Sequence, residues 1–268
     1  MAKPRALVLT GYGINCDRET RDAFDRAGAV AARVHINDLI AGEHRLSDYQ
    51  ILAFPGGFSY GDDVASGKVL AVKTKVNLGD EIQRFIADGK LIVGICNGFQ
   101  VMAKYGLLAD AGGDYRTQRV TVTFNDSNRY EDRWVNLAGA SRKCVWTRGL
   151  DRIYLPVAHG EGKFFTSPEL LRSLEDHDQV AFRYADADYR PAGGAYPANP
   201  NGSLGDVAGI CDPSGRLLGM MPHPERCLRF TNHPLWTRIR EELERKGEPV
   251  PDEGEGMKIF RNGVGYFA

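Results

Sequence analysis

Short apolar runs alternate with amphipathic segments in the N-terminal part of the chain. Each run holds five or six residues and is rich in Ala, Val, Ile and Leu, whereas Ala23, Phe24 and Ala27 recur at helical spacing. The pattern predicts strands at residues 5–10, 31–36, 50–54 and 91–95 and helices at residues 17–29 and 81–87. Because strands that alternate with helices pair in parallel, we expect a parallel sheet covered on both faces.

After about residue 115 the pattern changes. Apolar runs now follow one another without long helices between them and predict strands at residues 119–124, 134–137, 153–157, 180–184, 207–211 and 217–221. Residues 190–204 are rich in Pro, Gly and Asn, which predicts an irregular loop that could form a functional surface. A charged helix is predicted at 234–246, before a polar linker at 247–256. The predicted class is α/β, with a mixed, largely parallel sheet flanked by helices.

Composition narrows the class of protein further. The chain has 268 residues, 43% of them hydrophobic, and we expect one domain at residues 1–246 with a C-terminal extension at 247–268 packed on it. A formal net charge of −1 gives no electrostatic footprint for nucleic acid or an anionic membrane. No apolar run approaches the length that crosses a bilayer, and the first residues lead into a strand instead of a signal-peptide core. These features predict a cytoplasmic protein.

The five cysteines are odd in number, widely spaced and without a C-x-x-C pair. This pattern argues against both a disulfide framework and a zinc site, so we expect reduced thiols and no metal. We interpret Cys16, Cys144, Cys211 and Cys227 as small buried side chains. Cys96 is the one whose local sequence indicates chemistry.

Cys96 lies in the sequence GICNG at residues 94–98, directly after a predicted strand. The two glycines permit a sharp turn between a strand and a helix, since a Cβ at either position would collide with neighbouring backbone. Such a turn lifts the sulfur to the carboxyl edge of the sheet, beside the amides that open the next helix. The sequence therefore predicts that Cys96 is a nucleophile.

A nucleophilic thiol needs a base and a group that orients the base. His223 follows the apolar run 217–221, and Glu225 stands two residues further on in a segment stiffened by prolines. The Glu225 carboxylate can then reach one imidazole nitrogen while the other nitrogen faces the sulfur. We predict His223 as the base and Glu225 as its orienting group.

His159 is the rival base, because it also follows a predicted strand and has an acidic neighbour, Glu161. It could instead shape the mouth of the site or a subunit contact. His35 ends a strand, and His44 and His177 sit among charged residues, where solvated side chains are expected.

A tetrahedral oxyanion needs two preorganised donors, which backbone amides usually supply. Asn97, next to the nucleophile, offers one amide. The segment 55–58 (PGGF) follows a predicted strand and offers the Gly57 amide as the second. Two glycine-containing segments are set aside: 61–68 lacks the spacing of a phosphate loop, and 11–16 lacks the third glycine of a dinucleotide fingerprint.

Together these motifs resemble the triad, or class I, glutamine amidotransferases. The finer resemblance is to the glutaminase subunit of phosphoribosylformylglycinamidine (FGAM) synthase of purine synthesis, and it covers most of the chain. Five segments in order carry it: 55–62 (PGGFSYGD), 94–100 (GICNGFQ), 159–164 (HGEGKF), 199–203 (NPNGS) and 219–226 (GMMPHPER). The resemblance implies a flavodoxin-like sheet fold.

The resemblance also implies roles for these residues. Cys96 would attack the side-chain amide of glutamine, His223 would carry the proton to the departing ammonia, and Glu225 would hold His223. The amides of Gly57 and Asn97 would form the oxyanion hole. The glutamine itself would contact Gln100, Gly56 and Phe58.

A partner is implied as well, because ammonia released by this chain must be captured. The resemblance points to a large synthetase subunit that converts formylglycinamide ribonucleotide (FGAR) to FGAM with ATP and Mg²⁺, and to a small subunit that bridges the two. No cofactor is expected in this chain. The 190–204 loop and the His159 segment are the candidates for docking and for an ammonia channel. Residues 258–262 (KIFRN) are similar to the final helix of the fused, single-chain form of the enzyme, so use of the bridging subunit stays open.

Two other functions remain as alternatives. The chain could be another member of the superfamily, such as a cysteine hydrolase or a glutaminase that serves a different synthetase; the segments at 55–62 and 159–164 weigh against this. It could also be a catalytically silent binding subunit on the same scaffold, against which the intact set of Cys96, His223 and Glu225 argues.

Overall fold

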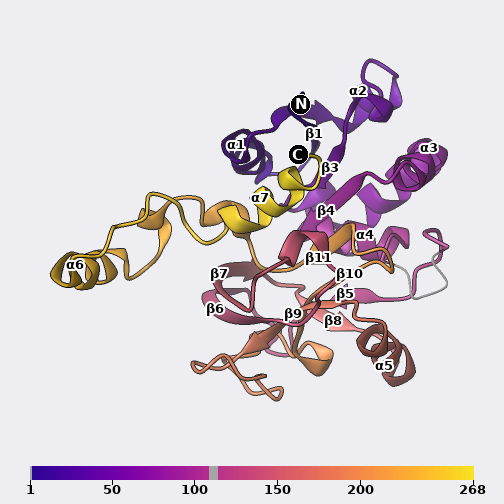
Figure 1. Cartoon of the computed structure of the whole chain (residues 1–268). Helices are drawn as coiled ribbons and strands as arrows, with labels where there is room; N and C mark the ends of the chain where they lie inside the picture. The colour runs from indigo at the N-terminus through magenta and orange to yellow at the C-terminus, as the bar shows by residue number, and fades with distance from the viewer. Residues whose placement is uncertain (1, 109–113) are drawn as a thin grey trace.

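A nine-stranded mixed sheet forms the centre of the protein, in the order β2-β1-β3-β4-β11-β10-β9-β6-β7 (Figure 1). The computed structural model describes residues 2–108 and 114–268. One half of the sheet is parallel and consists of β1 (Arg5–Thr10), β2 (Val30–His35), β3 (Ile51–Phe54), β4 (Leu91–Ile95) and β11 (Leu217–Met220). Except for the edge strand β2, these strands are largely apolar and buried, because both faces of this half are covered.

The other half of the sheet is antiparallel. It consists of β10 (Val207–Cys211), β9 (Val180–Ala185), β6 (Glu131–Gly139) and β7 (Arg152–His159). A separate two-stranded sheet pairs β5 (Thr121–Thr123) with β8 (Lys163–Phe165). The predicted α/β class with a mixed sheet flanked by helices is confirmed.

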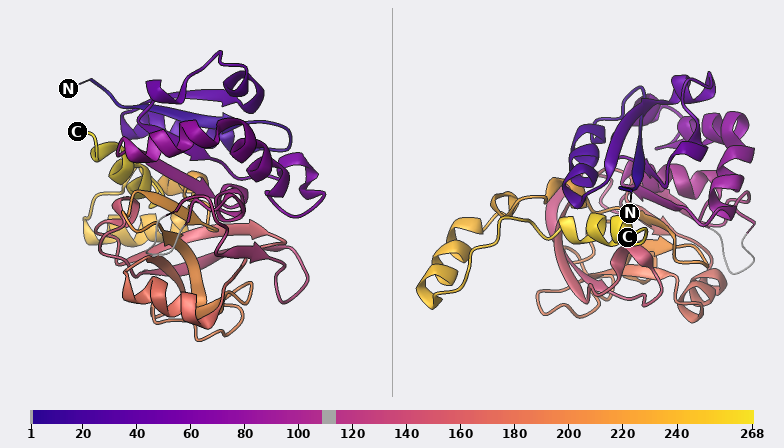
Figure 2. Two further views of the ribbon diagram at one scale, coloured as in Figure 1. Left: turned by 90° about the vertical axis from the view of Figure 1, so that its right-hand side faces the viewer. Right: turned by 45° about the horizontal axis from the view of Figure 1, so that its top comes forward.

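Helices cover both faces of the parallel half (Figures 1 and 2). On one face lie α1 (Asp17–Ala27) and α7 (Met257–Gly265), and on the other lie α3 (Lys68–Ala87) and α4 (Asn97–Tyr105). Shorter or peripheral helices are α2 (Ile36–Ile40), α5 (Pro168–Asp176) and α6 (Trp236–Lys246). Each strand therefore delivers the residue after its carboxyl end to one edge between these helical layers.

The last two helices of the chain, α6 and α7, differ in how they pack. In α7 the side chains of Met257, Ile259 and Phe260 are buried, and the Phe260 ring meets Phe24 of α1 edge-on with 5.1 Å between centroids. By contrast α6 projects from the body and has no buried residue (Figures 1 and 2). In this structure α7 packs on the same core as α1.

Several predicted boundaries were wrong. The run at 119–124 forms only the three-residue β5, outside the main sheet. The strand β8 was not predicted because its apolar run, Phe164 and Phe165, is only two residues long. The predicted loop at 190–204 has no helix or strand before Leu204. Within residues 2–108 and 114–268, none of the helices is long and apolar enough to cross a membrane.

Candidate active site

Cys96 occupies a strained turn between β4 and α4. Its backbone has φ 53° and ψ −108°, a left-handed φ that residues other than glycine seldom adopt, and such strain is typical of functional turns. A Cβ at Gly98 would lie 1.8 Å from the Phe54 carbonyl oxygen, and one at Gly94 would lie 2.6 Å from the Gly98 carbonyl oxygen. The predicted need for glycine on both sides of the cysteine is confirmed.

The thiol is buried, with 5% of the Cys96 residue exposed, and donates to the Ala158 carbonyl oxygen at 3.7 Å. Ala158 lies near the end of β7, so the antiparallel half of the sheet forms one wall around the sulfur. The parallel half of the sheet therefore carries Cys96, and the antiparallel half supplies the carbonyl group that its thiol contacts.

His223 and Glu225 follow β11, the strand next to β4. The His223 amide donates to the Pro156 carbonyl oxygen at 2.8 Å, and its ring Nδ1 lies 2.5 Å from Glu225 Oε1. Both side chains are buried, with 1% and 2% of the two residues exposed. The sequence expectation that the carboxylate reaches one imidazole nitrogen matches this geometry.

The surroundings of His223 stabilise its protonated form, which the ring would reach by accepting the proton of the Cys96 thiol. Burial lowers the pKa of this imidazole, but the Glu225 carboxylate and the Cys96 sulfur outweigh burial and raise the pKa well above its ordinary value. Nε2 has no hydrogen-bond partner among the described residues. This nitrogen is free to exchange a proton with the thiol, and a cationic ring would stabilise negative charge that develops on the sulfur.

Cys16 is the site residue that sequence reasoning missed. Its buried thiol lies against His223 and accepts a hydrogen bond from Arg226 Nη2 at 3.2 Å. Burial raises the pKa of the Cys16 thiol, which favours the neutral form. Since Cys16 ends the loop after β1, next to β3 in the sheet, its position at the same carboxyl edge was the available signal.

Cys16, His223 and Glu225 also offer ligand atoms within 4.8 Å of one another. The Arg226 guanidinium contacts the Cys16 sulfur, and this fixed positive charge opposes a metal cation at the same point. The geometry suits a proton relay at His223 better than a metal centre.

The segment Gly56–Gly57 passes beside these side chains. A Cβ at Gly56 would lie 2.8 Å from His223 Cε1, and Gly57, at φ 148°, forms an isolated antiparallel bridge with Ile14. In this pair Asn15 N donates to Gly56 O and Phe58 N donates to Gly13 O, so the Gly57 amide is not used and points away from the Gly11–Cys16 loop. A free amide here suits an oxyanion hole.

Asn97 and Gln100 are both buried, with 1% and 3% of the two residues exposed. The Gln100 Nε2 donates to the Glu161 carbonyl oxygen, and its Oε1 accepts from Asn97 Nδ2 at 2.9 Å. The predicted contact of Gln100 with substrate is untested, and in this structure its amide is committed to protein partners.

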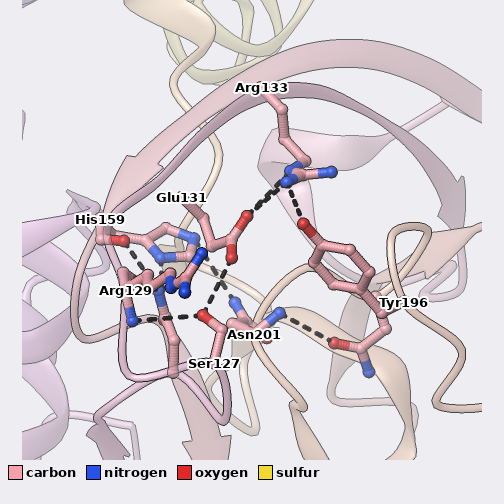
Figure 3. A network of polar contacts seen from close by, with 9 residues as sticks. Ser127, Arg129, Glu131, Arg133, His159, Tyr196 and Asn201 are labelled. Atoms are coloured by element: carbon pink, nitrogen blue, oxygen red, sulfur yellow. Dashed lines mark hydrogen bonds and ion pairs between the residues drawn. The ribbon is translucent and has the colours of Figure 1, made fainter.

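His159 is held in a buried polar network (Figure 3). Its Nδ1 lies 3.1 Å from Asn125 Oδ1, and Asn201 Nδ2 lies 3.5 Å from its Nε2. Burial, together with the charge of nearby His223, lowers the pKa of His159 to about 3, so the ring is neutral. With both nitrogens engaged, His159 supports the site rather than competing with His223 as the base.

The network extends to the surface through Glu131. This carboxylate accepts from Ser127 Oγ at 2.9 Å and from Arg133, which also donates to the Tyr196 hydroxyl at 2.6 Å (Figure 3). Of the loop at 190–204, Asn199, Asn201 and Ser203 are buried, whereas Tyr196 is 62% exposed. The NPNGS segment therefore packs inward against the His159 segment.

A surface cavity of about 250 Å³ lies beside the segments that contain Phe58 and Glu161, and Cys96 is not among its lining residues. Phe58 and Tyr130 form part of its wall, and the charged residues Asp62, Arg129 and Glu161 also line it. Burial raises the pKa of Tyr130, and the charge of the Cys96 sulfur adds to this rise. The predicted substrate contact Phe58 thus lines an opening, while Gly56 lies deeper, against His223.

Comparison with known proteins shows which family the chain belongs to. A family model described as a CobB/CobQ-like glutamine amidotransferase domain matches residues 3–267. The chain is 49% identical over 265 residues to the phosphoribosylformylglycinamidine synthase subunit PurQ of Methanococcus maripaludis, covering 98% of this chain and 97% of that protein. It is 48% identical to the PurQ subunit of Dehalococcoides mccartyi, covering 98% of each. The chain belongs to the glutamine amidotransferase family, among the PurQ subunits of phosphoribosylformylglycinamidine synthase.

A solved structure agrees with this assignment. The structure of PurLQS from Thermotoga maritima matches with a TM-score of 0.71 and 28% identity over 100% of both chains. Because separate PurQ subunits align with nearly the whole of this chain, the C-terminal extension is not a mark of the fused form.

Proposed function

We propose that this chain is the glutaminase subunit of phosphoribosylformylglycinamidine synthase and that Cys96, His223 and Glu225 carry out the hydrolysis of glutamine. The chain is a glutamine amidotransferase by family. The single observation that supports the assignment of residues is the buried imidazole with Nδ1 2.5 Å from Glu225 and an unpartnered Nε2 beside the Cys96 thiol.

Catalysis begins when the Cys96 sulfur attacks the side-chain amide carbon of glutamine, with the thiol proton passing to His223 Nε2. The amides of Gly57 and Asn97 stabilise the oxyanion that forms. The C–N bond then breaks, and His223 gives its proton to the departing nitrogen, releasing ammonia. Water attacks the resulting thioester with His223 as base, which yields glutamate and restores the thiol.

Substrate binding is proposed for the cavity near Phe58. Phe58 and Tyr130 enclose the aliphatic part of glutamine, while Arg129 suits its carboxylate and Glu161 suits its ammonium group. Gly56 and Gln100 support the walls of this pocket from beneath.

The ammonia is passed to a large synthetase subunit, which converts FGAR to FGAM with ATP and Mg²⁺ that it binds itself. The likeness to the PurLQS structure supports an assembly with this partner and with a small third subunit. We propose that the complex acts in the cytoplasm, where the five free thiols of this chain stay reduced.

Replacing Cys96 by alanine tests the function. In the assembled complex, Cys96→Ala should abolish glutamine-dependent synthesis of FGAM and leave ammonia-dependent synthesis intact, because the partner then receives ammonia from solution. Both rates are measured on the same preparation. Loss of both activities would mean that Cys96 is structural, and survival of both would refute the proposed nucleophile.

A further inference from the structure

The backbone directly after the oxyanion turn is strained. Tyr60, Gly61 and Asp62 have φ values of 55°, 70° and 54°, three consecutive residues in the left-handed region. For Tyr60 and Asp62 this conformation costs roughly 1–2 kcal/mol each. Such a conformation persists only where the surroundings hold it in place.

The side chain of Asn97 makes the contacts that hold this segment. Its Oδ1 accepts from the Ser59 amide at 3.2 Å, and its Nδ2 donates to Asp62 Oδ1 at 3.1 Å and to Gln100 Oε1 at 2.9 Å. The bonds to Ser59 and Gln100 are buried and thus shielded from water, and the bond to Asp62 is partly buried. One carboxamide therefore joins the segment after Gly57 to the helix that begins after Cys96.

The contacts continue to the segment that contains His159. The Ser66 hydroxyl donates to Asp62 Oδ2 at 3.0 Å, the Ser66 amide donates to Glu161 Oε2 at 3.3 Å, and Gln100 donates to the Glu161 carbonyl oxygen. Burial raises the pKa of Asp62 despite the donors around it. Three segments that surround the sulfur are thus tied together through Asn97.

On its other side the turn is held by backbone hydrogen bonds to the Gly11–Cys16 loop: Phe58 N donates to Gly13 O, and Asn15 N donates to Gly56 O. That loop fixes the turn relative to β1 but not relative to the nucleophile. Only the Asn97 side chain, among these contacts, links the turn that carries one oxyanion donor to the residue that carries the other.

We infer that the side chain of Asn97 is a positioning residue of the glutaminase reaction, which sets the Gly57 amide at the correct distance from the Asn97 amide and the Cys96 sulfur. This role is separate from that of the Asn97 backbone amide, and it rests on the proposed function. Asp62 is the main partner of this side chain, because Asp62 Oδ1 accepts a hydrogen bond from Asn97 Nδ2 and the Asp62 backbone is strained.

The first test separates oxyanion stabilisation from thiol reactivity. Asn97→Leu has a similar size, adds no charge and removes all three hydrogen bonds. In the assembled complex kcat for glutamine should fall about tenfold to a hundredfold with little change in KM, less than the loss of a whole oxyanion donor. Alkylation of Cys96 by iodoacetamide, which passes through no oxyanion, should keep its wild-type rate. The control is Asn77→Leu, at an exposed position of α3. This variant should change neither kcat for glutamine nor the rate of Cys96 alkylation.

The second test is a reciprocal exchange. Asn97→Asp alone sets two carboxylates against each other, and Asp62→Asn alone sets two amides against each other, so each variant should lose glutaminase activity. The double variant restores an N–H···O bond between the two positions and should recover at least about tenfold of the loss, as coupled neighbours do in double-mutant cycles. This test stands even where Asn97→Leu fails to fold.

Two results would overturn the inference: wild-type kcat in Asn97→Leu, or parallel loss of hydrolysis and alkylation together with no recovery in the double variant. Neither result bears on Cys96 itself. Failure of the proposed function would appear separately, as glutamine-dependent synthesis that survives in Cys96→Ala.

Discussion

At the scale of single residues, the nucleophile turn depends on close contacts that admit no side chain. Gly98 lies inside α4, where a change to alanine normally stabilises a helix by about 1 kcal/mol. Here the added Cβ would lie 1.8 Å from the Phe54 carbonyl oxygen, and that oxygen belongs to β3 at the centre of the sheet. Because of this contact, the substitution should destabilise the protein instead of stabilising it.

We predict that Gly98→Ala lowers the free energy of unfolding by about 1–3 kcal/mol, the usual cost of overpacking, and abolishes glutaminase activity by displacing Cys96. The matched control is Gly79→Ala in α3, where the nearest atom, the Tyr105 hydroxyl oxygen, lies 3.7 Å away. This change should raise the free energy of unfolding by roughly 0.5–1 kcal/mol. Urea unfolding of both variants measures the two changes in the free energy of unfolding. If both variants change it equally, the helix tolerates a Cβ at position 98.

His159 supplies a second prediction, for pH dependence. Its pKa is about 3 in the folded chain and about 6.5 when unfolded, so the unfolded state binds the extra proton between these values. Stability from the neutral ring is therefore complete above pH 6.5 and is lost as the pH falls toward 3. Between pH 6.5 and 5 this loss is roughly 2 kcal/mol.

We predict that His159→Gln reduces the difference in unfolding free energy between pH 7 and pH 5 by roughly this amount. Titration of the other groups is common to both proteins and cancels when they are compared. The same variant should leave alkylation of Cys96 by a glutamine analogue largely intact, whereas His223→Ala should suppress it. An unchanged pH dependence would contradict a buried neutral ring, and the opposite alkylation result would exchange the two roles.

Sequence reasoning located the residues that stand next to strand ends. Cys96, His223 and Glu225 each follow an apolar run, and the parallel order of β4 and β11 brings these ends together. It missed Cys16, which looked like a small buried thiol, and the side-chain role of Asn97. Both depend on contacts between loops far apart in the chain. For Cys16 the one local signal was its place after β1, and no local pattern encodes the role of the Asn97 side chain.

At the scale of secondary structure, the extension after α6 is part of the core. Phe260 has 0% exposure, and a Cβ at Gly263 would lie 2.3 Å from the Trp146 ring, so α7 fits closely against α1 and its surroundings. The sequence suggested an extension because a polar linker precedes it. What it could not supply was the partner surface, formed by residues near positions 24 and 146.

We predict that Phe260→Ala lowers the free energy of unfolding by about 3–5 kcal/mol, through lost burial and the cavity left behind. Lys258→Ala, on the exposed side of the same helix, should change it by less than about 0.5 kcal/mol. Chemical denaturation of the two variants measures the difference. Equal stability in both would mean that the extension is only loosely attached to the domain.

Patterns along the chain predicted the parallel half of the sheet better than the antiparallel half. Strands β1, β3 and β4 are continuous apolar runs, and such runs are recognised as buried strands from the sequence alone. By contrast β6 mixes exposed and buried positions over nine residues, and only its apolar centre was foreseen. The short β8 pairs with β5 across a stretch of chain that contains β6 and β7, so its existence depends on tertiary contacts.

At the scale of the whole molecule, the proposed catalytic residues lie deep between the two halves of the sheet. Cys96 is 5% exposed and His223 is 1% exposed, and we propose that glutamine approaches them from the small cavity near Phe58 and Tyr130. Ammonia released without the synthetase would be wasted. A site that is covered in the free chain and opened by its partner would prevent this loss.

We predict that the isolated chain hydrolyses glutamine feebly and that adding the synthetase subunit raises kcat/KM at least about tenfold, a coupling free energy of about 1.4 kcal/mol. Glutamate release is measured with and without the partner at fixed ionic strength. The rate of Cys96 alkylation by a glutamine analogue should rise in parallel, because both reactions need the same opening. Tyr130→Ala, which widens this opening, should raise the alkylation rate of the isolated chain and narrow the difference. Full glutaminase activity in the purified chain alone would contradict partner control and show that the closed site opens unaided.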